Sequence, residues 1–328
     1  MKRTLTFVLL VFALCQLNAK IIYVKADSDG NGKSWKSAFG NLQQALAVAE
    51  AGDEIWVASG FYYPTTTDNR DASFIIPDEV AVYGGFLGFE EDRQERDWKK
   101  NPTILSGEIG KPGPQDNAYT VVYLKNVSSS TIVDGLIITQ GCANGFSDKG
   151  NKDRCGGGLF NDGSEGVSTP VIKNCLFENN YARDGGAIFN YSDNGNASPR
   201  ISHCQFISNR ADLDGGAIYN DGSNGLCEPN IHKCYFYQNE ATYGASIINA
   251  ASYGKVRPRI SNSYFKGNIS YIRGSSIYNT REKGVNQPII TGCKTEDNRD
   301  GVGTTNSFNP ISHEESSELY FRETGLGY

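Results

Sequence analysis

The chain has 328 residues, with 31 Lys+Arg against 37 Asp+Glu and a formal net charge of −6. A negative balance disfavours nucleic acid as a partner, because contacts with phosphate groups require an excess of basic side chains. The length suits one large domain or two ordinary ones, but a solenoid also reaches it by adding coils around no central core. Whether the chain contains internal repeats therefore decides its fold class.

The first 19 residues have the composition of a signal peptide. Two basic residues precede an apolar run at 5–14, and the segment that follows ends in Ala19. A run of ten residues is too short to span a bilayer as a helix, so we expect cleavage after Ala19 and no membrane-spanning segment. A lipid anchor on Cys15 is the alternative, but Leu14 stands where a lipobox has a small residue. The mature chain, with a net charge of −8 after loss of those two basic residues, is expected to be extracellular, surface-exposed or periplasmic.

Residues 20–52 predict a strand at Tyr23–Lys25 and a short amphipathic helix at 42–49, which has apolar residues at positions 42, 45, 46 and 49 and a stop at Gly52. A helix in this position can cover the open end of a solenoid, where unpaired strand edges would otherwise be exposed. We therefore predict an N-terminal capping helix.

Less regular coils are expected from residue 53 to about 145. The segments 52–62 and 82–86 resemble the opening coils of secreted proteins of the pectin-lyase-like superfamily, and further strands are expected at Thr103–Leu105, Thr120–Leu124 and Thr131–Thr139. This resemblance implies a parallel β-helix, and it brings with it the polysaccharide lyases and hydrolases of that superfamily as candidate activities.

From about 150 to 300 the chain repeats. Five segments begin with a proline, at separations of 29, 30, 29 and 30 residues: Pro170, Pro199, Pro229, Pro258 and Pro288. A fixed period of this size indicates a solenoid. We predict an all-β, right-handed parallel β-helix over 53–300, with residues 301–328 as a C-terminal cap or tail.

Each coil has columns of similar residues at fixed positions. An isoleucine column, a cysteine column and a phenylalanine column face the interior, and the residue between cysteine and phenylalanine faces outward, so Gln205 is expected outside and Phe206 inside. Two asparagine columns are expected to stack and to turn the chain at its corners: Asn180, Asn209, Asn239, Asn268, Asn298 and Asn161, Asn190, Asn220, Asn249, Asn279.

Two motifs alternate in register within these coils. Gly-Gly-Ala-Ile stands at 185–188 and 215–218, and Phe-x-x-Asn at 177–180, 206–209, 236–239 and 265–268. They resemble the repeat of polymorphic outer-membrane proteins, which implies a surface adhesin with a β-helical passenger.

Two carboxylates are the best candidates for catalysis. Asp184 and Asp214 precede the glycine motif on adjacent coils, about 4.8 Å apart in a stacked solenoid. Like charges this close require splayed side chains, neutralisation by Arg183 or Arg273, a calcium ion, or use as a catalytic pair. His203 and His232 also lie on adjacent coils, but a general base among them would need a partner that the sequence does not name. No cofactor is expected apart from a possible Ca²⁺ at the carboxylates.

Exposed tyrosines predict a binding surface. Tyr235, Tyr237 and Tyr264 share one outward face, with Lys233 and Lys266 close by. Rows of aromatic rings stack against the apolar faces of sugars, and the lysines would attract acidic groups. A second aromatic column lies beside the inward isoleucines, and it binds as well, is covered by loops, or stabilises the sheet as an aromatic ladder: Phe160, Phe189, Tyr219 and Tyr278.

Three functions remain open at this point. The first is an exported β-helix that binds a polysaccharide or other extracellular polymer without catalysis. The second is a polysaccharide lyase or glycoside hydrolase, and the third is an adhesin or structural surface protein. In an oxidising compartment, we further expect Cys142 and Cys155 to close the loop between them as a disulfide.

Overall fold

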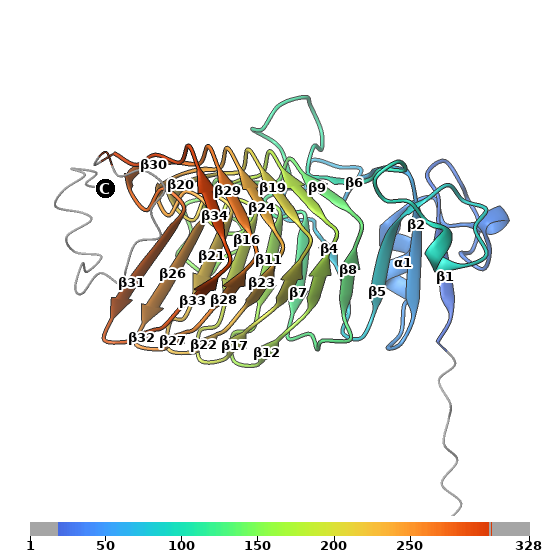
Figure 1. Cartoon of the computed structure of the whole chain (residues 1–328). Helices are drawn as coiled ribbons and strands as arrows, with labels where there is room; N and C mark the ends of the chain where they lie inside the picture. Colours follow the sequence, from blue (N-terminus) through green and yellow to red (C-terminus); the bar gives the residue numbers. More distant parts are fainter. Residues whose placement is uncertain (1–18, 302, 304–328) are drawn as a thin grey trace, which may run out of the picture.

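The computed structural model describes residues 19–301 and 303, and in this part of the chain the strands stack into one elongated parallel β-helix (Figure 1). The segment expected to be a signal peptide and the expected C-terminal cap lie almost entirely outside the described residues. Five sheets run along the axis, and the strands within each sheet are hydrogen-bonded to the equivalent strands of the neighbouring coils. The predicted solenoid is confirmed.

Sheet A has nine strands and includes the first strand of the chain. Its strands are β1 Ile21–Val24, β2 Glu54–Ala58, β5 Ala81–Phe86, β8 Ile132–Asp134, β13 Val171–Lys173, β18 Arg200–Ser202, β23 Asn230–His232, β28 Arg259–Ser261 and β33 Ile289–Thr291. Sheet B follows sheet A around each coil and has eight strands. These are β3 Gly60–Tyr62, β6 Thr103–Ser106, β9 Ile137–Thr139, β14 Leu176–Glu178, β19 Gln205–Ile207, β24 Tyr235–Tyr237, β29 Tyr264–Lys266 and β34 Lys294–Glu296.

Three further sheets complete the coils. Sheet D consists of β10 Cys142–Ala143, β15 Tyr181–Asp184, β20 Arg210–Asp214, β25 Glu240–Tyr243 and β30 Ile269–Arg273. Sheet C consists of β4 Phe74–Ile75, β7 Val122–Lys125, β11 Leu159–Asp162, β16 Ile188–Tyr191, β21 Ile218–Asp221, β26 Ile247–Ser252 and β31 Ile277–Glu282. The short sheet E closes the corner before the next coil, with β12 Val167–Ser168, β17 Asn196–Ala197, β22 Leu226–Cys227, β27 Lys255–Val256 and β32 Val285–Asn286.

The interior contains stacked aromatic rings. The rings of Phe177, Phe206, Phe236 and Phe265 lie face to face on successive coils, with centroids 5.1, 4.8 and 4.6 Å apart, and all four side chains are fully buried. Gln205, their neighbour in the chain, is exposed. The predicted register is therefore confirmed, because a slip of one residue would exchange these two faces.

The asparagine columns form continuous hydrogen-bonded ladders at two corners of the coil. From Asn180 to Asn298, each side-chain nitrogen donates to the side-chain oxygen of the next asparagine over 2.7–3.1 Å. The second ladder, from Asn161 to Asn279, does the same over 2.7–3.0 Å. In the first ladder, the left-handed conformation expected of the asparagines belongs to the residue before each of them, such as Asn179 (φ 53°) and Ser208 (φ 52°). The ladder asparagines thus pair with one another, and their neighbours make the turn.

A short helix covers the N-terminal end, as predicted. Helix α1, Leu42–Val48, begins at Asn41, whose side chain accepts a hydrogen bond from the backbone nitrogen of Gln44. It buries Leu42, Ala45 and Leu46 against the first coil. Two short 3₁₀ helices, η1 Trp35–Ser37 and η2 Arg93–Glu95, lie in the loops of the N-terminal coils. No helix in residues 19–301 is long and apolar enough to cross a membrane.

The expected disulfide between Cys142 and Cys155 is not formed, and both thiols are free and buried. Cys142 pairs with Tyr181 of β15, whereas Cys155 pairs with Asp184 of the same strand. Positions three residues apart along a strand are separated by about 10 Å, which exceeds the reach of a disulfide. The loop between them is held by other contacts, described below.

The assigned register predicts opposite effects of two neighbouring substitutions. Phe206→Asp places a carboxylate in the ring stack and should lower the free energy of unfolding by about 3 kcal/mol or more, because the buried charge has no partner. Gln205→Asp changes an exposed side chain and should stay within about 0.5 kcal/mol of the parent. Urea denaturation followed by circular dichroism measures both, and equal losses for the two variants would contradict the register.

Candidate functional site

Three tyrosines gather on the outer face of sheet B. Tyr235 of β24 lies opposite Tyr264 of β29 in register, with ring centroids 5.5 Å apart, and the ring of Tyr237 stacks on that of Tyr235 at 5.8 Å. All three side chains are half-buried. Their strands are adjacent in the regular part of the stack (Figure 1). The structure therefore brings together the tyrosines that the sequence singled out, and we call them the tyrosine row.

The two lysines expected beside the tyrosine row differ in their surroundings. Lys266 forms an ion pair with Glu296 at 2.6 Å, and the Tyr264 hydroxyl donates to the same carboxylate. The hydrogen bond between them raises the pKa of Lys266 and lowers the pKa of Glu296. Lys233 is exposed in the turn between β23 and β24, in the left-handed conformation (φ 51°). Within the described part of the chain, Lys233 has no carboxylate partner, so it is the lysine whose charge is available.

Of the candidate catalytic pair, Asp184 is buried and held by a loop, whereas Asp214 is partly exposed. Asp184 of β15 lies opposite Asp214 of β20, and its side chain is almost completely buried. Arg154 holds the Asp184 carboxylate at 2.9 Å, in place of the Arg183 or Arg273 that we expected from the sequence. Arg183 instead lies over the ring of Phe146. The pair is thus neutralised by an arginine from the loop 144–154, which the repeat pattern does not include.

The same loop carries a second cation to this face. The Lys149 ammonium group donates to the Tyr219 hydroxyl at 3.0 Å and lies 4.0 Å from the Asp221 carboxylate. Loop 144–154 therefore bridges sheets D and C through Arg154 and Lys149, each of which contacts a buried acidic or phenolic group. No group of three or more metal-ligating side chains occurs in residues 19–301, and a calcium ion at the carboxylates stays a prediction.

Burial shifts the pKa values of both carboxyl groups above that of an ordinary aspartate. It raises the pKa of Asp184, and it raises the pKa of Asp214 to about 7 together with the charge of Asp184. With Arg154 on Asp184, the neutral form is favoured at Asp214 up to about neutral pH. A charged and a neutral carboxyl side by side is an arrangement that can serve acid–base chemistry. In this conformation, however, Asp184 is buried and held by Arg154 of the loop, while Asp214 is partly exposed.

The second aromatic column is buried, and the expectation that it could bind a ligand directly was wrong. Phe160, Phe189, Tyr219 and Tyr278 face outward from sheet C, yet each is at most 2% exposed. Lys149 lies over the Tyr219 ring at 5.1 Å, and Cys155, at the end of the loop, packs into the same cluster. Loop 144–154 thus covers the column at Tyr219, while the rings of Phe160, Phe189 and Tyr219 also contact one another along the sheet as an aromatic ladder.

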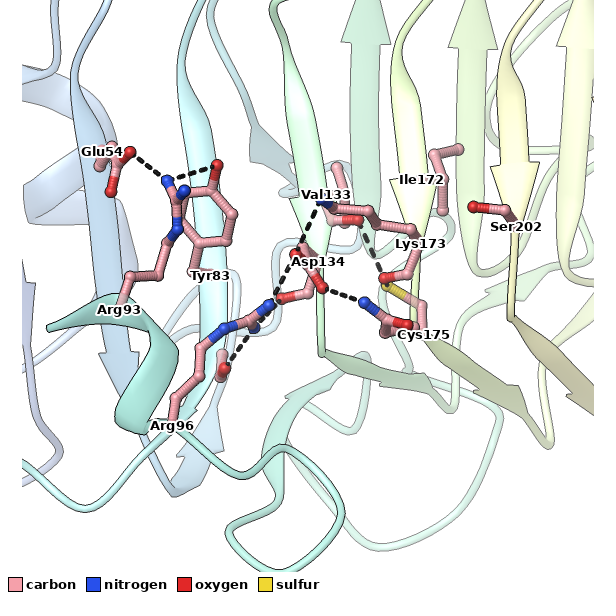
Figure 2. Close-up of polar contacts among 12 residues, drawn as sticks. Glu54, Tyr83, Arg93, Arg96, Val133, Asp134, Ile172, Lys173, Cys175 and Ser202 are labelled. Atoms are coloured by element: carbon pink, nitrogen blue, oxygen red, sulfur yellow. Dashed lines mark hydrogen bonds and ion pairs between the residues drawn. The ribbon is translucent and has the colours of Figure 1, made fainter.

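A polar network on sheet A was missed by the sequence analysis. The segment 87–101 folds over the N-terminal strands, and its Arg96 contacts Asp134 of β8 at 2.6 Å (Figure 2). Asn174 also donates to Asp134 at 2.8 Å, and Lys173 lies 3.4 Å from it. Arg93 of η2 contacts Glu54 and donates to the Tyr83 hydroxyl at 3.1 Å. These contacts hold segment 87–101 against the N-terminal strands of sheet A, so this part of the sheet is covered.

His232 has the partner that the sequence did not reveal. Its ring nitrogen Nδ1 lies 2.9 Å from the Ser261 hydroxyl on the next coil, and the ring of His203 lies 6.1 Å away. His232 faces outward on sheet A and is half-buried, whereas His203 is exposed in the turn that follows β18. The signal was available, because Ser261 stands 29 residues after His232 and thus occupies the same column.

The raised pKa of Asp214 predicts a pH-dependent stability. Because the folded value lies above that of an unfolded aspartate, the stability contributed by the neutral carboxyl is complete below about pH 4 and is lost as the pH rises through about 7. Asp214→Asn keeps the side chain neutral at every pH. The melting temperature of this variant relative to the parent should therefore increase between pH 5 and pH 8.

Asp148→Asn is a matched control, because Asp148 is an exposed carboxylate in the same loop region. Its melting temperature should follow that of the parent across the pH range. A parent protein whose stability does not fall relative to Asp214→Asn between pH 5 and pH 8 would contradict the assignment of the proton to this pair.

Two segments of the repeat region match a known protein family. Residues 174–191 and 203–221 match the family described as the Chlamydia polymorphic membrane protein repeat. No curated protein matches the chain. Among solved structures, a pectin methylesterase from Aspergillus niger is similar over 90% of each chain, with 14% identity and a TM-score of 0.42. A rhamnogalacturonan lyase is similar over 81% of this chain and 74% of its own, with 11% identity and a TM-score of 0.40.

The two matched segments include the Gly-Gly-Ala-Ile and Phe-x-x-Asn motifs of two successive coils, which confirms the resemblance noted from the sequence. They run from the turn before β14 to β16 and from the turn before β19 to β21, so each covers most of one coil. The chain is a parallel β-helix that carries repeats of the polymorphic membrane protein type.

Proposed function

We propose that this protein is exported and binds an extracellular polysaccharide through the tyrosine row of sheet B, without cleaving it. The observation that carries the proposal is the stacking of Tyr235 with Tyr237 and Tyr264 on the outer face of two adjacent coils. The predicted signal peptide at 1–19 and the repeats of a membrane protein family support export.

The geometry of the coil suits a polymer better than a small ligand. Residues in one column recur at about 4.8 Å along the axis, so a chain of sugars lying along the solenoid meets one ring after another. The outward column of sheet B continues beyond the tyrosine row through Gln205 and Leu176 to Ile137, all of which are at least partly exposed. This face is a long surface that carries apolar and aromatic side chains, which suit contact with the apolar faces of sugar rings.

The burial of Asp184 supports binding without catalysis. Asp184 is 1% exposed and held by Arg154, so a polymer on the outer surface does not reach it unless loop 144–154 moves away. A general acid or base must come within hydrogen-bond distance of the atom that it protonates or deprotonates. The described conformation leaves the tyrosine row accessible to a polymer, whereas Asp184, the charged member of the pair, is buried beneath the contact with Arg154.

A glycoside hydrolase or polysaccharide lyase is the second candidate. It is favoured by the neutral carboxyl of Asp214 beside the charged Asp184, an arrangement that separates the roles of acid and base. This function requires that loop 144–154 opens on binding of the substrate. An adhesin that contacts other proteins is the third candidate, and the polymorphic membrane protein repeats are the observation in its favour.

Substitution of the tyrosine row tests the proposal. The double variant Tyr235→Ala/Tyr264→Ala should retain a bound polysaccharide at least tenfold more weakly than the parent, since about 1 kcal/mol is lost with each stacking contact. Its melting temperature should be nearly unchanged, because both side chains lie outside the core. Affinity electrophoresis through gels that contain single polysaccharides measures the retention.

Tyr253→Ala is the matched control, because Tyr253 is an exposed tyrosine (55%) at another corner of the coil. Equal binding by the parent and the tyrosine-row variant would overturn the proposal. If the parent releases reducing ends from the polysaccharide and Asp184→Asn does not, the protein is an enzyme and the proposal of binding without cleavage is wrong.

A further inference from the structure

The outer face of sheet A is covered at one end and uncovered further along the solenoid. Over the N-terminal strands it is covered by segment 87–101, whereas over β18, β23 and β28 it is bare. Arg200 of β18 and Arg259 of β28 are exposed on this bare part, in one column with the exposed Asn230 between them. Lys233 follows β23 in the adjoining turn. We call Arg200, Arg259 and Lys233 the basic strip.

The three cations of the basic strip have no carboxylate partner in the described part of the chain. Other basic residues of the regular coils behave differently, since Arg257 forms an ion pair with Glu228 and Lys266 with Glu296. The strands β18, β23 and β28 contain no acidic residue. In a chain with a net charge of −6, a bare face with three unpaired cations is a local exception.

Hydrogen-bonding groups fill the rest of this face. Ser202, His232 and Ser261 form the second outward column, directly beside the column of Arg200 and Arg259. Hydroxyl, imidazole and amide groups can donate to carboxylate or sulfate oxygens, and the hydroxyl groups also match the hydroxyls of a sugar. The face thus combines charge with donors, as recognition of an anion requires.

The spacing of the cations defines the ligand further. Arg200 and Arg259 are two coils apart, which corresponds to about 10 Å along the axis. Lys233 lies at the corner between sheets A and B, two residues before Tyr235. The basic strip and the tyrosine row are therefore neighbouring surfaces that meet at the turn carrying Lys233.

We propose that the basic strip binds the carboxylate or sulfate groups of an acidic polysaccharide that lies along the solenoid, while the tyrosine row contacts its sugar rings. This inference rests on the proposed function and assigns the class of the polymer. It also moves the charge recognition from Lys266, whose charge is paired with Glu296, to Arg200 and Arg259. A linear anionic chain meets both arginines in one extended conformation because they share a column.

The test uses the purified mature protein and three probes: polygalacturonate, dextran sulfate and neutral dextran. The double variant Arg200→Gln/Arg259→Gln should bind the acidic probe of the parent at least tenfold more weakly. The affinity of the parent should fall with rising salt, and the variant should show a shallower dependence on salt concentration. Neither protein should prefer neutral dextran.

Lys255→Gln/Lys283→Gln is the matched control. It also removes two positive charges, but from exposed positions at the corner formed by sheet E. This variant should bind the acidic probe within about twofold of the parent, whereas a purely general effect of net charge would weaken both variants equally. Equal weakening would overturn the assignment to the basic strip.

The outcomes separate this inference from the proposed function. Loss of binding in Tyr235→Ala/Tyr264→Ala with full binding in Arg200→Gln/Arg259→Gln leaves the tyrosine row intact as a glycan site and overturns the basic strip. Tighter binding of the parent to duplex DNA or to phosphatidylserine vesicles than to either acidic probe overturns the polysaccharide as its ligand. Binding of no probe by the parent overturns both.

Discussion

Every residue of a regular coil lies about 4.8 Å above its equivalent in the coil before, and the rest of the structure depends on this stacking. Inside the solenoid it is favourable, because identical groups complement one another: phenylalanine rings stack face to face, and asparagine amides donate and accept along one line. A sequence that repeats the same residue at the same position therefore stabilises its fold at every coil. This is why the period of 29 to 30 residues is strict where the coils are regular.

On the outer surface of the solenoid, the same stacking brings like charges together, and each charged column relieves this repulsion in a different way. Asp184 and Asp214 face each other across one coil step, and the pair relies on Arg154 and on retention of a proton. Lys266 and Glu296 alternate in sign within one column and pair directly. Arg200 and Arg259 avoid each other by the interposed Asn230. A ligand can exploit only the last arrangement, because it leaves the charges unsatisfied.

The regular coils could be read from the sequence because their contacts lie one period apart. The inward position of Phe206, the outward position of Gln205 and both asparagine ladders follow from the columns alone. Even the pairing of Lys266 with Glu296 is implied, since 30 residues separate them. What could not be predicted are the segments 87–101 and 144–154, which do not repeat. No column indicates that such a loop folds back over Asp134 or Tyr219, so the sequence could not decide whether the aromatic column on sheet C is exposed or buried.

The asparagine ladder has a direction, and this bears on how such a chain can change its length. From Asn209 to Asn268, each amide of the first ladder donates forward to the next asparagine and back to the carbonyl of a phenylalanine in the preceding coil, so both of its N–H groups are used. Insertion or deletion of one whole coil rejoins donor to acceptor without a gap. Removal of part of a coil would leave buried amides unpaired and shift every column behind it. The ladder therefore favours gain or loss of whole coils, so the outer surface can lengthen or shorten during evolution only in steps of one coil.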